Sequence, residues 1–324
     1  MDVDMAVSSV HLDGRRRFAQ ADTLSQLSGD VKDKARSWGL TGCEVGDKLL
    51  PTCETRTRNS AMPNDLDALL KGWDFDAADG SKNVRKIVGG DGRLKVQIRI
   101  KCGLIQWDAD GRPDGRRPYG KESLLDHCHD LLREHERKYG TQDGFKLSPT
   151  LTEEVREEVM DYYHRRLILF QIGDFERARD DANHNLNLMA IVRRFVDDQE
   201  IVMAHEKYRA FVLMDRSRAE AMIRLAKHEP EAAVEALDKG IADVKDFYRE
   251  YDREDIIAES QEIKVLEQMK SQVRDTHNLP LSDSEILANL RDEQKKAVEN
   301  EDYERAAELR EEIAEVMKRL AAKP

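Results

Sequence analysis

The sequence predicts a mainly α-helical protein with a small antiparallel β element on its N-terminal side, repeat-like αα-hairpins in its middle and a further helical hairpin at its C-terminal end. From about residue 121 onwards, apolar residues recur at steps of three and four, which is the period of amphipathic helices. Alternation of apolar and polar residues is confined to the region around residues 83–108 and indicates strands.

Composition limits the class of protein. Charged residues make up 36% of the 324 positions, aromatic residues make up 6%, and the formal net charge is −12, so we expect a soluble chain with modest cores. No apolar run approaches the roughly 20 residues that a membrane span needs, and no secretory signal is present. The four cysteines form no CxxC pair, which argues against zinc ribbons and a disulfide framework. We therefore predict a cytoplasmic, reduced protein with no membrane contact and no cofactor.

Residues 1–61 differ from the rest of the chain. They contain the basic run Arg15-Arg16-Arg17 and scattered polar residues, but no sustained apolar period. Such a segment buries too little apolar surface to offset the entropy of ordering it. We expect it to be either a disordered arm or an upstream extension of a natural product that starts at Met62.

Residues 62–120 are predicted to form a small α+β element built around a β-hairpin. A short helix is expected near residue 66, followed by strands whose alternation marks a half-buried sheet. A loop rich in glycine, arginine and proline closes the element at 108–120. The expected strands and their turn are, in chain order, Val84–Val88, the turn Gly89–Gly92, Leu94–Ile100 and Gly103–Trp107.

Residues 121–280 are predicted to be a helical, repeat-like body. Gly173-Asp174 separates two expected helices, and Pro230 stands at the start of another, where proline is well tolerated. After the first helix, which begins near residue 121, the expected helices are 152–172, 175–188, 190–215, 217–227, 231–250 and 256–273.

Two helical pairs in this body resemble tetratricopeptide-type repeats. Gly173-Asp174-Phe175-Glu176-Arg177-Ala178 is similar to the turn and second helix of one such unit, and Leu225, His228 and Ala232 resemble a degenerate second one. The spacing is not a clean 34 residues, so the resemblance implies an architecture of stacked hairpins. The chain from about Gly72 also resembles a poorly characterised group of bacterial proteins that end in the hairpin considered next.

Residues 281–324 are predicted to form a hairpin of two helices. Asn300-Glu301-Asp302 breaks the helical period, and Asp302 is a good N-cap for the second helix, whose first turn favours the negative charge of Glu304. We expect the small side chains of Ala306 and Ala307 to allow a close helix approach. The apolar residues of the two helices are Ile286, Leu287, Leu290, Ala297 and Val298, then Tyr303, Ala306, Ala307, Leu309, Ile313, Val316, Met317 and Leu320.

This segment resembles the UVR motif, also called the UvrB/UvrC motif, which joins two subunits of the bacterial excision nuclease. The resemblance implies a hairpin that binds another protein, either a second UVR hairpin or a copy of itself. Gln294 departs from the usual apolar residue and Glu311 from the usual Asp. The alternative is a helical pair that merely caps the fold. The matching, candidate protein-binding positions are Ala297, Val298, Asp302, Tyr303, Glu304, Ala306, Ala307, Leu309, Arg310 and Ile313.

A basic island covers the strands and the loop that follows them. Residues 82–117 hold ten Lys and Arg against four Asp, a combination that favours contact with nucleic acid or an acidic protein. The candidate contact residues are Arg85, Lys95, Arg99 and Trp107. The other interpretations are contact with this chain's own acidic helices, or a solvated polar strand face. The chain's charge of −12 predicts weak DNA binding at most.

Metal and catalytic motifs are weak. His127 and His129 flank Cys128, but neighbours on a helix lie about 100° apart, so these side chains cannot close on one ion. Asp108 and Asp110 resemble the start of a calcium loop, although proline occupies the position that needs glycine. No phosphate loop, dinucleotide fingerprint or nucleophile motif is present. We therefore predict no metal site and no enzymatic activity.

The sequence thus predicts a non-enzymatic protein–protein interaction protein whose C-terminal hairpin docks a partner. One alternative is an accessory factor of nucleotide excision repair, which would meet a nuclease subunit through the hairpin and DNA through the basic island. Another is an adaptor or regulator of a protease–chaperone complex. That alternative is weakened because arginine-kinase activators that carry UVR-like motifs typically have zinc-binding CxxC pairs, and this sequence has none.

Overall fold

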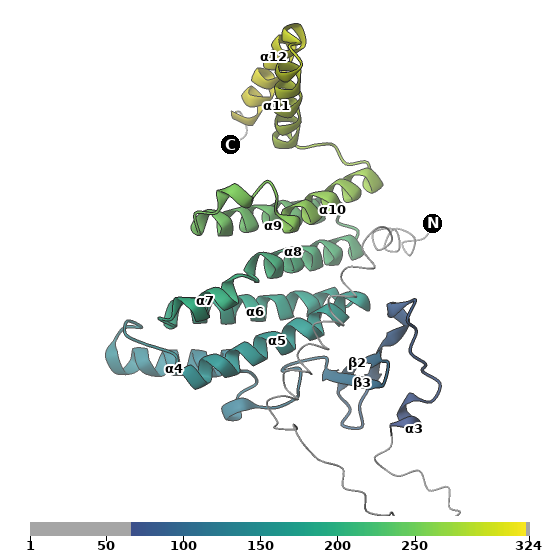
Figure 1. Ribbon diagram of the computed structural model, residues 1–324, viewed down its shortest axis with the longest axis vertical. Coiled ribbons are helices and arrows are strands. Elements are labelled where there is room, and N and C mark those ends of the chain that lie inside the picture. The colour runs from purple at the N-terminus through teal and green to yellow at the C-terminus, as the bar shows by residue number, and fades with distance from the viewer. Residues whose placement is uncertain (1–65, 322–324) are drawn as a thin grey trace, which may run out of the picture.

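A computed structural model describes residues 66–321, without the side chain of Ser284. The fold is mainly α-helical, as predicted, with a small sheet on its N-terminal side and a hairpin at its C-terminal end. Figure 1 shows the helices stacked in layers that follow the order of the chain, with the sheet against the first layers and the hairpin beyond the last. The predictions for residues 1–61 lie outside the described residues.

The N-terminal element is a three-stranded antiparallel sheet in the order β1-β2-β3. The strands match their predicted positions, and the third is one residue longer than expected. Their register places Val84 opposite Ile98 and Ile98 opposite Ile105, so one apolar face forms and packs on Ile168 and Leu169. The elements are α3 (Asp67–Leu70), η1 (Gly80–Asn83), β1 (Val84–Val88), β2 (Leu94–Ile100), β3 (Gly103–Asp108) and η2 (Pro118–Gly120).

The turn Gly111–Gly115 fastens the sheet to the helical body. Arg112 Nη1 lies 3.1 Å from Glu158 Oε2, and Arg165 Nη1 donates to the carbonyl oxygen of Gly111 at 2.8 Å. Glu158 is fully buried and also accepts from the backbone N–H of Leu124 at 3.0 Å. A buried carboxylate needs such partners because its water shell is lost, so these contacts fix the turn in one position.

The helical body runs from α4 to α10, and each long helix packs on its neighbours in the chain. Ser148 caps α5, with Pro149 at its first position, so this helix begins three residues earlier than expected. The elements are α4 (Leu124–Tyr139), α5 (Pro149–Gln171), α6 (Phe175–Phe195), α7 (Gln199–Glu206), α8 (Arg209–Ala226), α9 (Pro230–Glu250), η3 (Glu254–Ile256) and α10 (Gln261–His277).

The prediction of one long helix over 190–215 is wrong. α6 continues to Phe195, and the chain then leaves the helical conformation at Val196. Asp198 restarts it by accepting from the backbone N–H of Glu200 at 2.9 Å, which is the role of an N-cap. The apolar period continues through the break because α7 and α8 also turn apolar faces inward, so periodicity alone did not reveal it.

One apolar core extends from α4 to α10, and α8 and α9 approach each other closely at Gly240. A Cβ atom on Gly240 would stand 2.2 Å from Ser217 Oγ, so a larger residue there would push the two helices apart. Two ion pairs lie inside the body. Arg165 Nε donates to Asp181 at 2.9 Å, and Arg166 Nε donates to Asp215 at 3.0 Å.

Within residues 66–321, none of the helices has the length and apolar character required to cross a lipid bilayer.

Candidate docking hairpin

The docking hairpin consists of α11 (Asp283–Glu299) and α12 (Tyr303–Ala321). A capping box starts α11, in which the backbone N–H of Ser282 donates to Glu285 at 2.9 Å and that of Glu285 donates to Ser282 Oγ at 3.3 Å. Asp302 starts α12 by accepting from the backbone N–H of Arg305 at 3.1 Å. The predicted N-cap is thus present, and Glu301 makes the turn with a φ of 60°.

The two helices meet along a narrow apolar seam. Ala297 on α11 packs with Ala306 and Leu309 on α12, and Leu290 lies beside them. Val316 continues the buried row nearer the base of the hairpin. Alanine at facing positions brings helix backbones close, so this seam holds the hairpin together but buries little apolar area.

Gln294, which departs from the apolar residue usual in UVR motifs, lies on this seam. Its Nε2 donates to the backbone carbonyl oxygen of Ala306 at 3.2 Å. A half-buried amide with a hydrogen-bond partner is tolerated. The departure therefore adds a polar contact inside the hairpin and leaves the pairing of the two helices intact.

A second row of apolar side chains on the hairpin faces solvent. Tyr303 is 67% exposed and Met317 is 49% exposed, and Ala307, the charged Arg310 and Ala314 lie between them at helical spacing on the same side of α12. Arg291 Nη2 lies 4.0 Å from Met317 Sδ. We call Val298, Tyr303, Ala307, Ala314 and Met317 the exposed stripe.

Val298 belongs to this stripe because it lies seven residues, or two turns, beyond Arg291 on α11, and it is 50% exposed. Ala307 was expected at the closest helix approach, and this expectation is wrong. Ala306 takes that position and Ala307 faces outward, because neighbouring residues on a helix point about 100° apart.

The predicted protein-binding positions therefore divide into two groups. One group forms the seam, and the other is available to a partner. Buried or half-buried are Ala297, Ala306, Leu309 and Ile313, whereas Val298, Asp302, Tyr303, Glu304, Ala307 and Arg310 are exposed.

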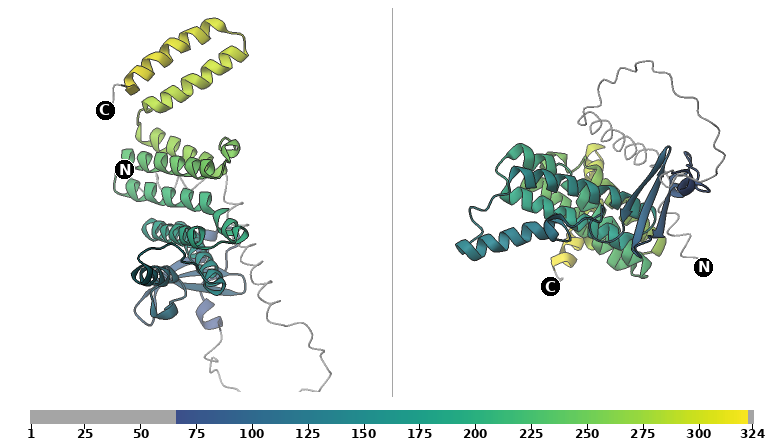
Figure 2. Two further views of the ribbon diagram at one scale, coloured as in Figure 1. Left: turned by 90° about the vertical axis from the view of Figure 1, so that its left-hand side faces the viewer. Right: turned by 90° about the horizontal axis from the view of Figure 1, so that it is seen from below.

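An ion cluster at the base joins the hairpin to the body. Glu285 Oε1 lies 2.9 Å from Lys270 Nζ, and its Oε2 lies 2.6 Å from Arg274 Nη2. Burial alone would raise the pKa of Glu285, but the hydrogen bonds from Ser282 and the charge of Lys270 lower this pKa to about 2. Figure 2 shows the hairpin leaving the body at this end and extending away from it. Sequence analysis missed this carboxylate, although the spacing Ser282-x-x-Glu285 is typical of a capping box and could have located it.

The far end of the hairpin is acidic. Residues 292–312 carry nine Asp or Glu against four Lys or Arg. The exposed Tyr303 stands at the start of α12 within this acidic segment. A phosphate backbone would be repelled there, so the tip favours a protein surface over nucleic acid.

The basic island does not present the expected solvated polar face. Lys95 is 7% exposed and Arg99 is 9% exposed. Lys95 Nζ pairs with Asp108 and lies 2.9 Å from Asp91 Oδ2. Arg99 Nε donates to the backbone carbonyl oxygen of Trp73 at 3.0 Å. The expectation is wrong because Lys95 is held by carboxylates of the neighbouring turn and strand, while the segment that precedes the sheet contacts Arg99.

Arg85 and Trp107 also have partners within the chain. The guanidinium of Arg85 lies 3.8 Å from the ring centre of Trp73 and donates to Gln97 at 2.8 Å. Trp107 is buried in the apolar face of the sheet. Lys86, which sequence reasoning passed over, lies 2.7 Å from Asp174 at the start of α6. Of these contacts, the ion pair of Lys86 joins the island to an acidic residue of the helical body.

The residues that resembled a metal site lie in different environments and make other contacts. His127 stacks on Tyr119 with ring centres 4.0 Å apart, while Cys128 is buried in the core. Burial raises the pKa of the Cys128 thiol to about 12. Residues 66–321 contain no group of three or more His, Cys, Asp or Glu side chains that could hold a metal ion.

Comparison with known proteins agrees with the hairpin geometry. The chain has no significant match among curated proteins or among solved structures. Residues 284–318, which span most of α11 and α12, match the UvrB/uvrC motif of the UVR family. The chain therefore carries a UVR motif as its C-terminal helical hairpin.

Proposed function

We propose that this protein is a non-enzymatic interaction protein that binds another protein through the exposed stripe of its docking hairpin. The observation that carries the proposal is the exposure of Val298, Tyr303 and Met317 on helices whose other side is already paired. Large apolar side chains gathered on one surface favour a protein contact, since covering them removes apolar area from water.

The attachment of the hairpin supports this role. Its base is held by Lys270 and Arg274, while its tip extends away from the body (Figure 2). A partner can therefore approach the stripe without first displacing the body. The stripe has the length of a helix, so its natural complement is another helix or helical hairpin, either in a UVR-containing protein or in a second copy of this chain.

A second candidate is an accessory role in nucleotide excision repair. The UvrB/uvrC motif at residues 284–318 favours a nuclease subunit as the partner. The internal pairing of Lys95 and Arg99 disfavours the part of this candidate in which the basic island contacts DNA.

The proposal is tested with the full chain and the variant Ala307→Glu, used as immobilised baits. Ala307 is exposed, so a glutamate there leaves the hairpin folded but places a charge in the middle of the stripe. The matched control is Lys296→Gln. It lowers the net charge by the same amount but lies about 200° around α11 from Val298, and therefore off the stripe. Sedimentation of the free chain reports self-pairing separately from capture of other proteins.

We expect Ala307→Glu to lose the captured partner, or the self-associated species, while Lys296→Gln keeps it. Equal capture by both variants and the wild type would show that the stripe is not the docking surface. A chain ending at Pro280 should behave like Ala307→Glu.

A further inference from the structure

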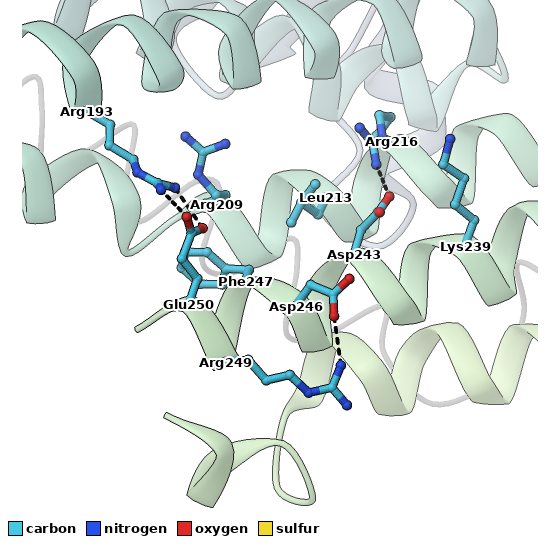
Figure 3. Close-up of a pocket in the computed structure, with 10 residues that line it drawn as sticks. All are labelled: Arg193, Arg209, Leu213, Arg216, Lys239, Asp243, Asp246, Phe247, Arg249 and Glu250. Carbon is cyan, nitrogen blue, oxygen red and sulfur yellow. Dashed lines mark hydrogen bonds and ion pairs between the residues drawn. The ribbon is translucent and has the colours of Figure 1, made fainter. Parts of the chain in front are cut away.

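A shallow groove crosses one side of the helical body, on α6, α8 and α9. It has a volume of about 790 Å³ around Arg209, Phe247 and Glu250 and continues into a second hollow of about 520 Å³. The two hollows share Arg216, Lys239 and Asp243. They therefore form a single groove along the three helices, and Figure 3 shows the side chains that line the first hollow, which come from α6, α8 and α9.

The groove is rich in cations in a chain that is acidic overall. Its two hollows are lined by seven Lys or Arg and five Asp or Glu, against a net charge of −12 for the whole sequence. The lining cations are Arg179, Arg193, Arg209, Arg216, Arg224, Lys239 and Arg249.

Most of these cations already have a partner. Arg193 Nη1 lies 2.8 Å from Glu250, Arg249 Nη1 lies 2.7 Å from Asp246, and Arg216 Nη2 lies 2.5 Å from Asp243. Lys239 is exposed where the two hollows meet, and no carboxylate within residues 66–321 lies within 4.0 Å of its ammonium group. The groove thus holds an uncompensated positive charge at its centre.

The groove also has an apolar floor. Leu213 on α8 and the half-buried Phe247 on α9 lie among the charged side chains of the first hollow. Arg209 and Glu250 stand beside them (Figure 3). An apolar side chain of a ligand could cover this floor while charged groups on either side of it meet the cations.

We propose that the groove binds an acidic peptide segment of another protein, with carboxylates directed at Lys239 and an apolar side chain on Phe247. The row from Arg209 to Arg224 spans 15 residues of α8, or about 22 Å, and so accommodates about seven residues of extended chain. This site is separate from the exposed stripe and does not depend on it.

A peptide fits better than a nucleic acid. The five carboxylates that alternate with the cations would repel a continuous row of phosphates. A peptide can offer amide N–H groups to these carboxylates and its own carboxylates to the cations. The apolar floor gives a peptide side chain a place that a sugar–phosphate backbone cannot use.

The test uses the full-length protein and a fluorescent decapeptide in which glutamates alternate with uncharged serines around one central leucine, and binding is followed by anisotropy. Saturable binding that weakens with salt is expected. Lys239→Glu, an exposed position whose replacement leaves the core untouched, should weaken binding about tenfold because like charges then face each other. Glu235→Lys, in the second hollow, should strengthen it. Lys264→Glu makes the same charge change on α10, outside the groove, and should leave binding unchanged.

Absence of saturable peptide binding overturns the proposal. So does equal weakening by Lys239→Glu and Lys264→Glu, since it would show an effect of net charge alone. Tighter binding of a single-stranded oligonucleotide than of the peptide, lost in Lys239→Glu, would assign the groove to nucleic acid. Ala307→Glu leaves peptide binding intact if the groove and the stripe are independent, and loss of binding in this variant would contradict their separation.

Discussion

Arg274 Nη2 lies 2.6 Å from Glu285 Oε2, so an ion pair bridges the last helix of the body and the first helix of the docking hairpin. Lys270 contacts the other carboxylate oxygen and also lies 2.7 Å from Asp238 on α9. The hairpin is therefore oriented by charges that belong to two layers of the body.

The base of the hairpin should be sensitive to acid. The pKa of Glu285 is lowered from 4.5 to about 2 in the folded protein, so its ion pairs contribute stability above pH 4.5, and this contribution is lost as the pH falls towards 2. We expect Glu285→Gln to melt at a lower temperature than the wild type at pH 7, with a difference that shrinks between pH 4.5 and pH 3. If the difference in melting temperature stays constant over this pH range, the ion pairs of Glu285 do not stabilise the base of the hairpin.

The two neighbouring alanines of α12 should respond differently to the same change. Ala306→Glu buries an unpaired charge in the seam, which costs several kcal/mol, and should reduce the helical circular dichroism that belongs to the hairpin. Ala307→Glu places its charge in solvent and should leave both helicity and melting temperature unchanged. Similar melting of the two variants would mean that the seam is not where the structure places it.

Glu158 should be essential for attaching the sheet to the body. Glu158→Ala leaves the buried end of Arg112 and the N–H of Leu124 without their acceptor, and breaking a buried pair in this way costs about 3–5 kcal/mol. Glu153→Ala, on the exposed side of the same helix, removes only a surface pair with Arg156, worth about 0–1 kcal/mol. Urea denaturation of the two variants measures the difference.

The basic island should contribute little to DNA binding. Lys95→Glu inverts a buried charge beside Asp108 and should lower the melting temperature. Lys101→Glu and Arg116→Glu change exposed positions, so they should leave stability unchanged and remove whatever weak, salt-sensitive binding exists. Damage-selective DNA binding that survives physiological salt would instead favour the repair candidate.

Local patterns in the sequence predicted the elements well. Alternation in Leu94–Ile100 and the glycines of the turn before it located the first two strands. Steps of three and four located both helices of the docking hairpin, and Asp302 located its turn. These features depend on residues that are close together in the chain, so the sequence displays them directly.

Features that depend on distant residues could not be predicted. Alternation shows that Lys95 and Arg99 share a face, but it does not reveal that the chain around Trp73 covers this face. Likewise, the sequence does not reveal that Arg165 and Arg166 pair with Asp181 and Asp215, because these carboxylates come from other helices. Ala306 and Ala307 could not be told apart until the relative rotation of the two helices was known.

The layered order of the helices also sets the order in which the molecule is completed during translation. Each long helix of the body after α4 packs on a helix that precedes it in the chain, so part of its contact surface is already available when it leaves the ribosome. The docking hairpin emerges after every layer of the body, and Lys270 and Arg274 must be in place before Glu285 can be held. A nascent chain therefore assembles its helical body before the exposed stripe of the docking hairpin becomes available for a partner to bind.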